Sequence, residues 1–218
     1  AMKVCTDSCI FGAWATPGDE LKKIEALDIG AGTGLLSLML AQRFENIVID
    51  AVEIDAAAAK QAGENFLHSP WANRLNVFCD DIENFTATQK YDFIICNPPF
   101  FHNNLKSPEA KKNKAKHVQT LDEMMLLHII EHHLKNEGSF ALMLSFERRE
   151  ICIKAAGKLG WFPVKELWVK QTPAHDYFRA MIQFEKKLQQ TCIQTMCIKD
   201  AANLYTNEYD ALMSNFLR

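Results

Sequence analysis

A strand, three glycines and a helix follow one another in Leu27-Asp28-Ile29-Gly30-Ala31-Gly32-Thr33-Gly34, and the fold of this chain can be read outward from that segment. Residues 23–29 become apolar toward the glycines, which is typical of a buried strand. Residues 34–44 are rich in leucine and predict a mostly buried helix. Glycines at such a turn let the backbone approach a ligand and expose the helix N-terminus to it.

Short apolar runs alternate with helical patterns along the rest of the chain. Because strands separated by helices of ten or more residues pair in parallel through right-handed crossovers, we predict an α/β fold. Its sheet is mostly parallel, with helices on both faces, and Gln171-Thr172-Pro173 predicts a late hairpin with an irregular loop. Strands are expected at 47–52, 76–79, 91–96, 139–144, 162–169, 178–184 and in an additional run at 191–198, and helices at 55–68, 122–134, 147–159 and 205–217.

The composition is that of one globular domain. Of 218 residues, 48% are hydrophobic and 23% charged, which excludes disordered, collagenous and coiled-coil chains. No linker divides the chain, so we expect a single domain over 1–218. The net charge of −3 excludes a uniformly basic nucleic-acid coat and is compatible with a local basic patch.

The sequence also predicts where the protein works. No apolar run approaches the ~20 residues that span a bilayer, and the N-terminus lacks the layout of a signal peptide. The seven cysteines are odd in number and contain no C-x-x-C pair, which indicates reduced thiols. We therefore expect a cytoplasmic protein with no membrane span, no metal and no obligatory protein partner.

Acidic side chains at successive strand ends indicate the cofactor. Asp28 lies at the end of the first strand, where its charge repels a pyrophosphate and attracts an ammonium group. Glu53 ends the second strand, where a carboxylate accepts from both hydroxyls of a ribose, and Asp81 follows the third, where it can accept from an adenine amino group. The glycine spacing also departs from the dinucleotide pattern G-x-G-x-x-G. Although each residue alone could be a turn or a solvated strand end, together they predict S-adenosylmethionine, bound by Asp28, Gly30, Gly32, Gly34, Glu53 and Asp81.

The second chemical motif is Asn97-Pro98-Pro99-Phe100, which follows the fourth strand on the same edge. Two prolines fix the backbone and remove two N–H donors, so the motif is rich in acceptors. The Asn97 side-chain oxygen and the Pro98 carbonyl suit the two N–H bonds of a planar primary amine. Phe100 offers a face on which a planar group can stack. A plain proline-stiffened turn is the alternative, but the position opposite a cofactor site favours catalysis by Asn97, Pro98, Pro99 and Phe100.

These segments carry a family resemblance. The chain resembles the class I S-adenosylmethionine methyltransferases whose amino-methylating members carry N-P-P-[FYW]. Within them it is similar to the bacterial tRNA(Val) adenine-N(6) methyltransferases, and Ser8 stands where that family usually has glycine. The matching segments are Lys3-Val4 with Thr6-Asp7, Gly12-Ala13-Trp14-Ala15, 27–36, Ala51-Val52-Glu53, Ser69-Pro70-Trp71-Ala72 and Asn97-Pro98-Pro99-Phe100.

The resemblance implies a fold and a reaction. The fold is the Rossmann-like class I methyltransferase sheet of seven strands, the last antiparallel. The reaction is methyl transfer to N(6) of adenine 37 in tRNA(Val), with the base flipped from the anticodon loop and stacked on Phe100. The family places Lys3, Thr6, Asp7 and Asn97 near the cofactor, and the segment after the N-P-P motif near RNA.

Other activities remain open from the residues alone. Guanine-N(2) methyltransferases of ribosomal RNA carry N-P-P-F and glutamine methyltransferases of release factors carry N-P-P-Y. The first usually have a second copy of the domain and the second a helical N-terminal domain, and we expect neither in 218 residues. A nicotinamide-dependent dehydrogenase is disfavoured by the glycine spacing and Asp28.

Two further patterns have competing interpretations. Lysines gather after the N-P-P motif, where a solvated face and a phosphate-contacting surface are about equally expected. His128-Ile129-Ile130-Glu131-His132 matches the H-x-x-E-H zinc pattern, but its place in an α/β crossover helix favours a solvated helix face. The candidate RNA-binding lysines are Lys106, Lys111, Lys112, Lys114 and Lys116.

Overall fold

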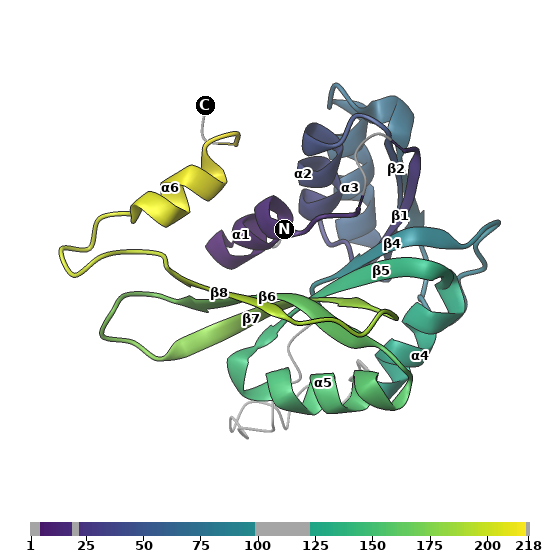
Figure 1. Cartoon of the computed structure of the whole chain (residues 1–218). Helices are drawn as coiled ribbons and strands as arrows, with labels where there is room; N and C mark the ends of the chain where they lie inside the picture. The colour runs from purple at the N-terminus through teal and green to yellow at the C-terminus, as the bar shows by residue number, and fades with distance from the viewer. Residues whose placement is uncertain (1–4, 19–21, 99–122, 217–218) are drawn as a thin grey trace, which may run out of the picture.

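The computed structural model describes residues 5–18, 22–98 and 123–216 and contains one sheet of eight strands (Figure 1). The strand order across the sheet is β3-β2-β1-β4-β5-β7-β6-β8. The strands are β1 (Ile24–Ile29), β2 (Ile47–Glu53), β3 (Leu75–Cys79), β4 (Tyr91–Cys96), β5 (Leu134–Ser145), β6 (Phe162–Lys170), β7 (Tyr177–Glu185) and β8 (Cys192–Cys197).

The strand directions confirm the predicted α/β fold. The neighbours from β3 to β5 pair in parallel, whereas β7 runs antiparallel to both β5 and β6. The expected hairpin is therefore β6 and β7, and β7 is the antiparallel strand of the class I layout. The additional C-terminal strand is also present as β8, which extends the sheet by pairing in parallel with β6.

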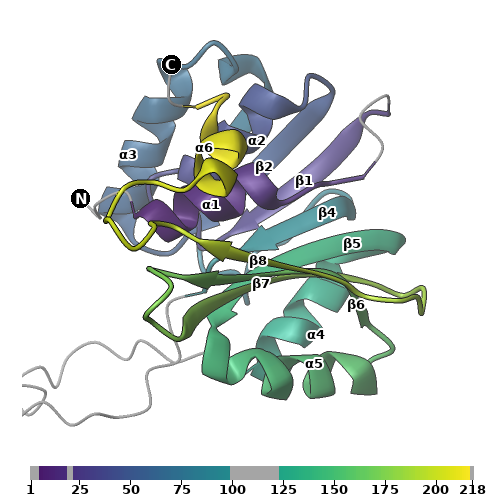
Figure 2. The same ribbon diagram turned by 60° about the vertical axis from the view of Figure 1, so that its left-hand side comes forward.

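Helices cover both faces of the sheet (Figure 2). One face carries α1, α2, α3 and α6, and the other carries α4 and α5, each over its own buried hydrophobic cluster. Among the described residues, no helix is long and apolar enough to cross a membrane. The bounds are α1 (Thr6–Trp14), α2 (Leu35–Arg43), α3 (Ala56–Leu67), α4 (Glu123–His133), α5 (Arg149–Lys158) and α6 (Asn207–Met213).

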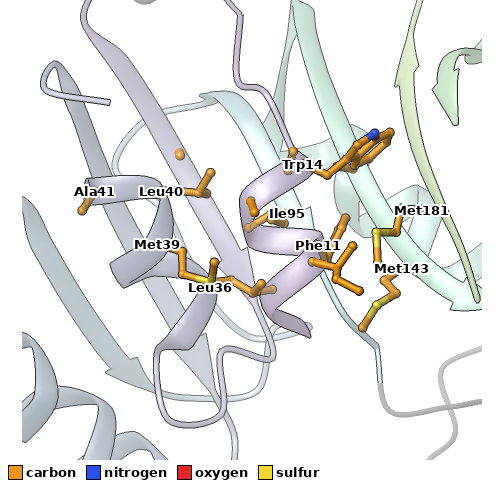
Figure 3. Close-up of a cluster of buried hydrophobic side chains, with 14 of the residues drawn as sticks. Phe11, Trp14, Leu36, Met39, Leu40, Ala41, Ile95, Met143 and Met181 are labelled. Carbon is orange, nitrogen blue, oxygen red and sulfur yellow. The ribbon is translucent and has the colours of Figure 1, made fainter. Parts of the chain in front are cut away.

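The helix α1 is an element that the sequence patterns did not predict. Its side chains Phe11 and Trp14 are buried, and Phe11 points toward Met143 and Met181 of the sheet (Figure 3). A Cβ at Gly12 would lie 2.7 Å from Sδ of Met39 in α2, so the missing side chain lets the two helices approach. The helix is therefore held by packing against α2 and the sheet rather than by a periodic pattern of its own.

The C-terminal end of α1 is fixed as well. Arg43, the last residue of α2, donates from Nη1 to the carbonyls of Gly12 and Ala15 at 2.8 and 2.6 Å. These carbonyls belong to the last turn and to the residue that ends α1, where helix carbonyls lack partners within the helix. The guanidinium of Arg43 thus fixes the C-terminal end of α1 to α2. The N-terminal end of α1 lies at the carboxyl edge of the sheet, where Ser8 contacts Asn97.

Candidate functional site

The register of the sheet brings the predicted carboxylates and the N-P-P motif to one edge. Ile29 of β1 pairs with Val52 of β2 on one side and with Cys96 of β4 on the other. Glu53 pairs with Cys79 at the end of β3. The residues that follow these strand ends, which include Gly30, Asp81 and Asn97, therefore lie side by side at the carboxyl edge, where open α/β sheets bind ligands.

The glycine turn lies between β1 and α2, where the sequence predicted a strand-to-helix turn. Gly30, Gly32 and Gly34 all have positive φ, at 70°, 58° and 81°, a region that other residues rarely adopt. A Cβ at Gly34 would lie 2.4 Å from the ring of Phe66 in α3, so this position also requires a close approach. Gly30 is exposed and faces open space. The turn therefore presents bare backbone at the sheet edge.

Glu53 lies directly beside this turn. Its side chain is buried, with Oε2 accepting from the N–H of Gly32 at 2.7 Å and Oε1 from the N–H of Asp55 at 2.8 Å. Asp55 in turn begins α3, where it accepts from the N–H groups of Ala57 and Ala58. A carboxylate has about four acceptor sites, so two remain for hydroxyl donors. Glu53 therefore joins the glycine turn to α3 and keeps the capacity to bind a ribose.

Asp28 is fully buried in the middle of this edge. Its Oδ2 accepts from the hydroxyl and the N–H of Ser37 in α2, at 2.7 and 3.2 Å. Its Oδ1 is buried and has no hydrogen-bond partner within the described residues. Burial raises the pKa of the Asp28 carboxyl to about 6, the charge of Glu53 adds to this, and the bonds from Ser37 oppose it. A buried carboxylate oxygen without a partner fits an ammonium group of a ligand.

Asn97 has a similar unpartnered oxygen at the neighbouring strand end. Its Nδ2 donates to the hydroxyl of Ser8 in α1 at 3.2 Å. Its Oδ1 is buried and, in the part of the chain that the structure describes, accepts no hydrogen bond. Pro98 is buried behind it. The arrangement leaves Asn97 Oδ1 as an acceptor for a donor group, whereas Pro99 and Phe100 lie outside the described residues.

The N-terminal residues expected near the cofactor are only partly described. Asp7 of α1 accepts from Nε of Arg179 in β7 at 2.8 Å and from the N–H of Ser8 at 3.1 Å. Thr6 is exposed at the start of α1, and Lys3 lies outside the described residues. The structure therefore brings Asp7 to Arg179 at the carboxyl edge, a contact that the sequence did not predict.

The expected adenine end of the site follows β2 and β3. Asp81 is half-buried, and its Oδ1 accepts from the N–H of Glu83 at 3.0 Å. Ile54, the residue after Glu53, is 68% exposed although it is large and apolar. An exposed apolar side chain between two such strand ends offers a surface for a flat ring. Sequence reasoning missed Ile54, and it also missed Ser8, Ser37 and Arg179, whose roles depend on contacts between distant segments.

The two remaining sequence patterns have different outcomes. His128 and His132 are exposed on α4, and Glu131 Oε1 accepts from Nζ of Lys186 at 3.0 Å in an exposed ion pair, which confirms a solvated helix face. Among residues 5–18, 22–98 and 123–216, no group of histidine, cysteine, aspartate or glutamate side chains could hold a metal ion. The candidate RNA-binding lysines, from Lys106 to Lys116, lie outside the described residues.

Comparison with known proteins agrees with this geometry. The family model of the methyltransferase small domain matches residues 18–152. A tRNA1(Val) (adenine(37)-N6)-methyltransferase of Dyadobacter fermentans is 45% identical over 85% of this chain and 76% of its own length. One from Flavobacterium psychrophilum is 35% identical over 99% of this chain and 92% of its own length.

The likeness extends to solved structures. The crystal structure of a predicted O-methyltransferase from Agrobacterium tumefaciens superposes with a TM-score of 0.71 over 95% of each chain. Because the two sequences are only 15% identical, this similarity shows the fold alone.

Proposed function

The chain belongs to the family of tRNA1(Val) (adenine(37)-N6)-methyltransferases, and from this membership we propose that it transfers a methyl group from S-adenosylmethionine to N(6) of adenine 37 in tRNA(Val). tRNA is the substrate, and the anticodon loop is the part that we infer enters the site. The observation that carries the proposal is a pair of buried oxygens at adjacent strand ends, Asp28 Oδ1 and Asn97 Oδ1, neither of which has a hydrogen-bond partner among the described residues. One suits the cofactor ammonium and the other suits the target amine.

The chain would act on the amine by holding it in line with the methyl group. When bound, S-adenosylmethionine supplies an electrophilic methyl group on a sulfonium sulfur. Asn97 Oδ1 and the Pro98 carbonyl would accept hydrogen bonds from the two N–H groups of the adenine amine and turn its lone pair out of conjugation with the ring. As the N–C bond forms and the C–S bond breaks, the nitrogen releases one proton to water, so positioning dominates and no strong base is needed.

The remaining site residues have proposed roles in binding. We assign the ribose hydroxyls to Glu53, the adenine amino group to Asp81 and the ammonium group to Asp28. Thr6 and Asp7, with Lys3 before them, would lie at the methionine end of the cofactor. Gly30, Gly32 and Gly34 let the backbone approach it. Phe100 would stack on the flipped adenine, and Pro99 would stiffen the turn that carries Asn97 and Phe100.

Nucleoside mass spectrometry tests the whole proposal. The purified protein is incubated with S-adenosylmethionine and tRNA, and the tRNA is then digested to nucleosides. We expect N(6)-methyladenosine that depends on both the protein and the cofactor. Parallel reactions contain ribosomal RNA or a release factor in place of tRNA. If guanine N(2) of the ribosomal RNA or a glutamine of the release factor is methylated and adenine of tRNA is not, the proposal is contradicted and a related N-P-P enzyme is favoured.

Replacing Glu53 by alanine should weaken S-adenosylmethionine binding tenfold to a hundredfold. Hydrogen bonds to a charged group contribute ~1.5–3 kcal/mol, and Glu53→Ala removes those to the ribose. Calorimetry on the purified protein measures the change. The matched control is Glu64→Ala, which removes an exposed carboxylate from α3 and should leave S-adenosylmethionine binding unchanged. Tighter binding of a nicotinamide dinucleotide than of S-adenosylmethionine would overturn the cofactor assignment.

The lysines after the N-P-P motif should contribute to tRNA affinity through phosphate contacts. Replacing Lys111, Lys112, Lys114 and Lys116 by alanine should weaken tRNA binding and flatten its salt dependence. Each lost contact should reduce the logarithmic slope by ~0.7–0.9. A control variant with the same loss of charge replaces lysines at the opposite edge of the sheet. If both variants show the same slope of tRNA affinity against salt, the lysines after the N-P-P motif belong to a solvated surface and do not contact phosphates. The control lysines are Lys22, Lys23, Lys158 and Lys187.

A further inference from the structure

We propose that Ser8 is a positioning residue that holds the Asn97 side chain so that Oδ1 faces the target amine. The inference rests on the proposed function, because it concerns how the amine acceptor is aimed. It goes beyond the N-P-P motif itself, since Ser8 lies on α1, 89 residues away in the sequence.

The hydrogen bond to Ser8 involves only one of the two polar atoms of the Asn97 amide. Nδ2 donates to Ser8 Oγ at 3.2 Å, whereas Oδ1 is buried and has no partner within the described residues. An amide has a donor end and an acceptor end, and only the acceptor end can bind an N–H of the adenine amine. Reversal of the amide would bring its N–H groups against those of the amine. In the observed orientation the Ser8 hydroxyl accepts from Nδ2, and Oδ1 is the end that would meet the substrate.

Ser8 is itself held on a fixed support. Its N–H donates to Asp7 Oδ1, while Asp7 Oδ2 accepts from Nε of Arg179 in β7. Both partners of this ion pair are largely buried, with side-chain exposures of 13% for Asp7 and 18% for Arg179. The other end of α1 is locked to α2 by Arg43. The hydroxyl of Ser8 is therefore presented to Asn97 by a helix that is anchored at both ends.

The Asn97 amide provides a readout that does not depend on activity. In ¹⁵N-labelled protein, its side-chain resonances are identified by their absence from Asn97→Ala. Ser8→Ala should move this pair of resonances, whereas Ser214→Ala should leave it in place, because the hydroxyl of Ser214 donates to the carbonyl of Ala211 in an exposed turn. Ser8→Thr keeps a hydroxyl and should restore the pair toward its original position. An unmoved pair in Ser8→Ala would overturn the inference.

A double-mutant cycle tests the consequence for catalysis. Single-turnover methyl transfer to tRNA(Val) is measured at saturating cofactor and RNA for wild type, Ser8→Ala, Asn97→Ala and the double variant. One neutral hydrogen bond corresponds to about a two- to tenfold change, so Ser8→Ala should lower the single-turnover rate by that factor. In a titration with tRNA, the concentration that gives half the maximal rate should stay unchanged. In the Asn97→Ala background the same substitution should have no effect.

The outcomes separate the inference from the proposed function. Equal slowing by Ser8→Ala in both backgrounds would show that Ser8 acts through general packing and would overturn the inference alone. Full activity of Ser8→Ala would do the same. A wild-type protein that methylates no tRNA would refute the proposed function, and the inference would fall with it. Normal cofactor binding by Ser8→Ala completes the expected result, because Asp28 and Glu53 are untouched.

Discussion

Replacing Asn97 by alanine should lower the rate of methyl transfer ~100- to 1000-fold while S-adenosylmethionine binding stays nearly unchanged. The substitution removes the buried oxygen that has no partner within the described residues. A preorganised hydrogen-bonding group at a reacting centre contributes ~2.7–4 kcal/mol to lowering the barrier, measured for donors at oxyanion holes, which sets the scale here. The measurement is single-turnover transfer to tRNA(Val) at saturating cofactor and RNA.

The substitution Asn97→Ala should slow the methyl-transfer step without weakening the binding of cofactor or tRNA. The cofactor carboxylates Asp28 and Glu53 keep their contacts in Asn97→Ala, and phosphate contacts dominate tRNA affinity. Binding of both substrates should therefore persist. Asn207→Ala, at the start of α6, is the matched control and should react at the normal rate. If Asn97→Ala kept near-normal turnover, the N-P-P motif would be a structural turn and the methylated group would have to bind elsewhere.

Replacing Asp28 by asparagine should weaken S-adenosylmethionine binding roughly a hundredfold at pH 7. Removing one charge of a buried pair costs about 3 kcal/mol, because the ammonium group then lacks its counter-charge. Asparagine keeps the shape of the side chain and an oxygen that can accept from Ser37. Calorimetry at pH 7 measures the loss, and the exposed Glu64→Ala serves again as the control.

The pH dependence of binding gives a second signature of Asp28. Burial raises the pKa of this carboxyl to about 6, and binding of an ammonium group requires the ionised form. The affinity of the wild type should therefore rise by up to about tenfold per pH unit between pH 5 and pH 6 and level off above that. The affinity of Asp28→Asn for S-adenosylmethionine should not show this rise between pH 5 and pH 6. Parallel curves for the two proteins would contradict the assignment of the ammonium group to Asp28.

The same carboxyl should make the protein without cofactor less stable at neutral pH. The folded state holds the proton on Asp28 more tightly than the unfolded chain does. The contribution of this proton to the free energy of unfolding is therefore fully present below pH 3.8 and is lost as the pH rises through about 6. The shift corresponds to about 3 kcal/mol. In urea unfolding, the stability of Asp28→Asn relative to wild type should increase by up to about that amount between pH 4 and pH 7. A constant difference would show that Asp28 does not titrate as its burial implies.

Most of the fold could be predicted because its signals are local. The predicted strand at 91–96 has the observed bounds of β4, and most other elements agree within two residues. The main differences are β5, which begins at Leu134 rather than 139, and α6, which ends at Met213. The helix α1 was not predicted at all, since its stability comes from burying Ile10, Phe11 and Trp14 against other elements.

The glycine turn, the strand ends and the residues that follow them could be read from the residues alone. A glycine turn and carboxylates at the ends of parallel strands follow from local pattern and topology, which places Asp28, Glu53 and Asn97 on one edge. The side chains that support these residues emerge only once the elements are packed together. Arg179 meets Asp7 across 172 residues and Ser8 meets Asn97 across 89. Such contacts leave no periodicity in the sequence, because they depend on how α1 packs across the sheet.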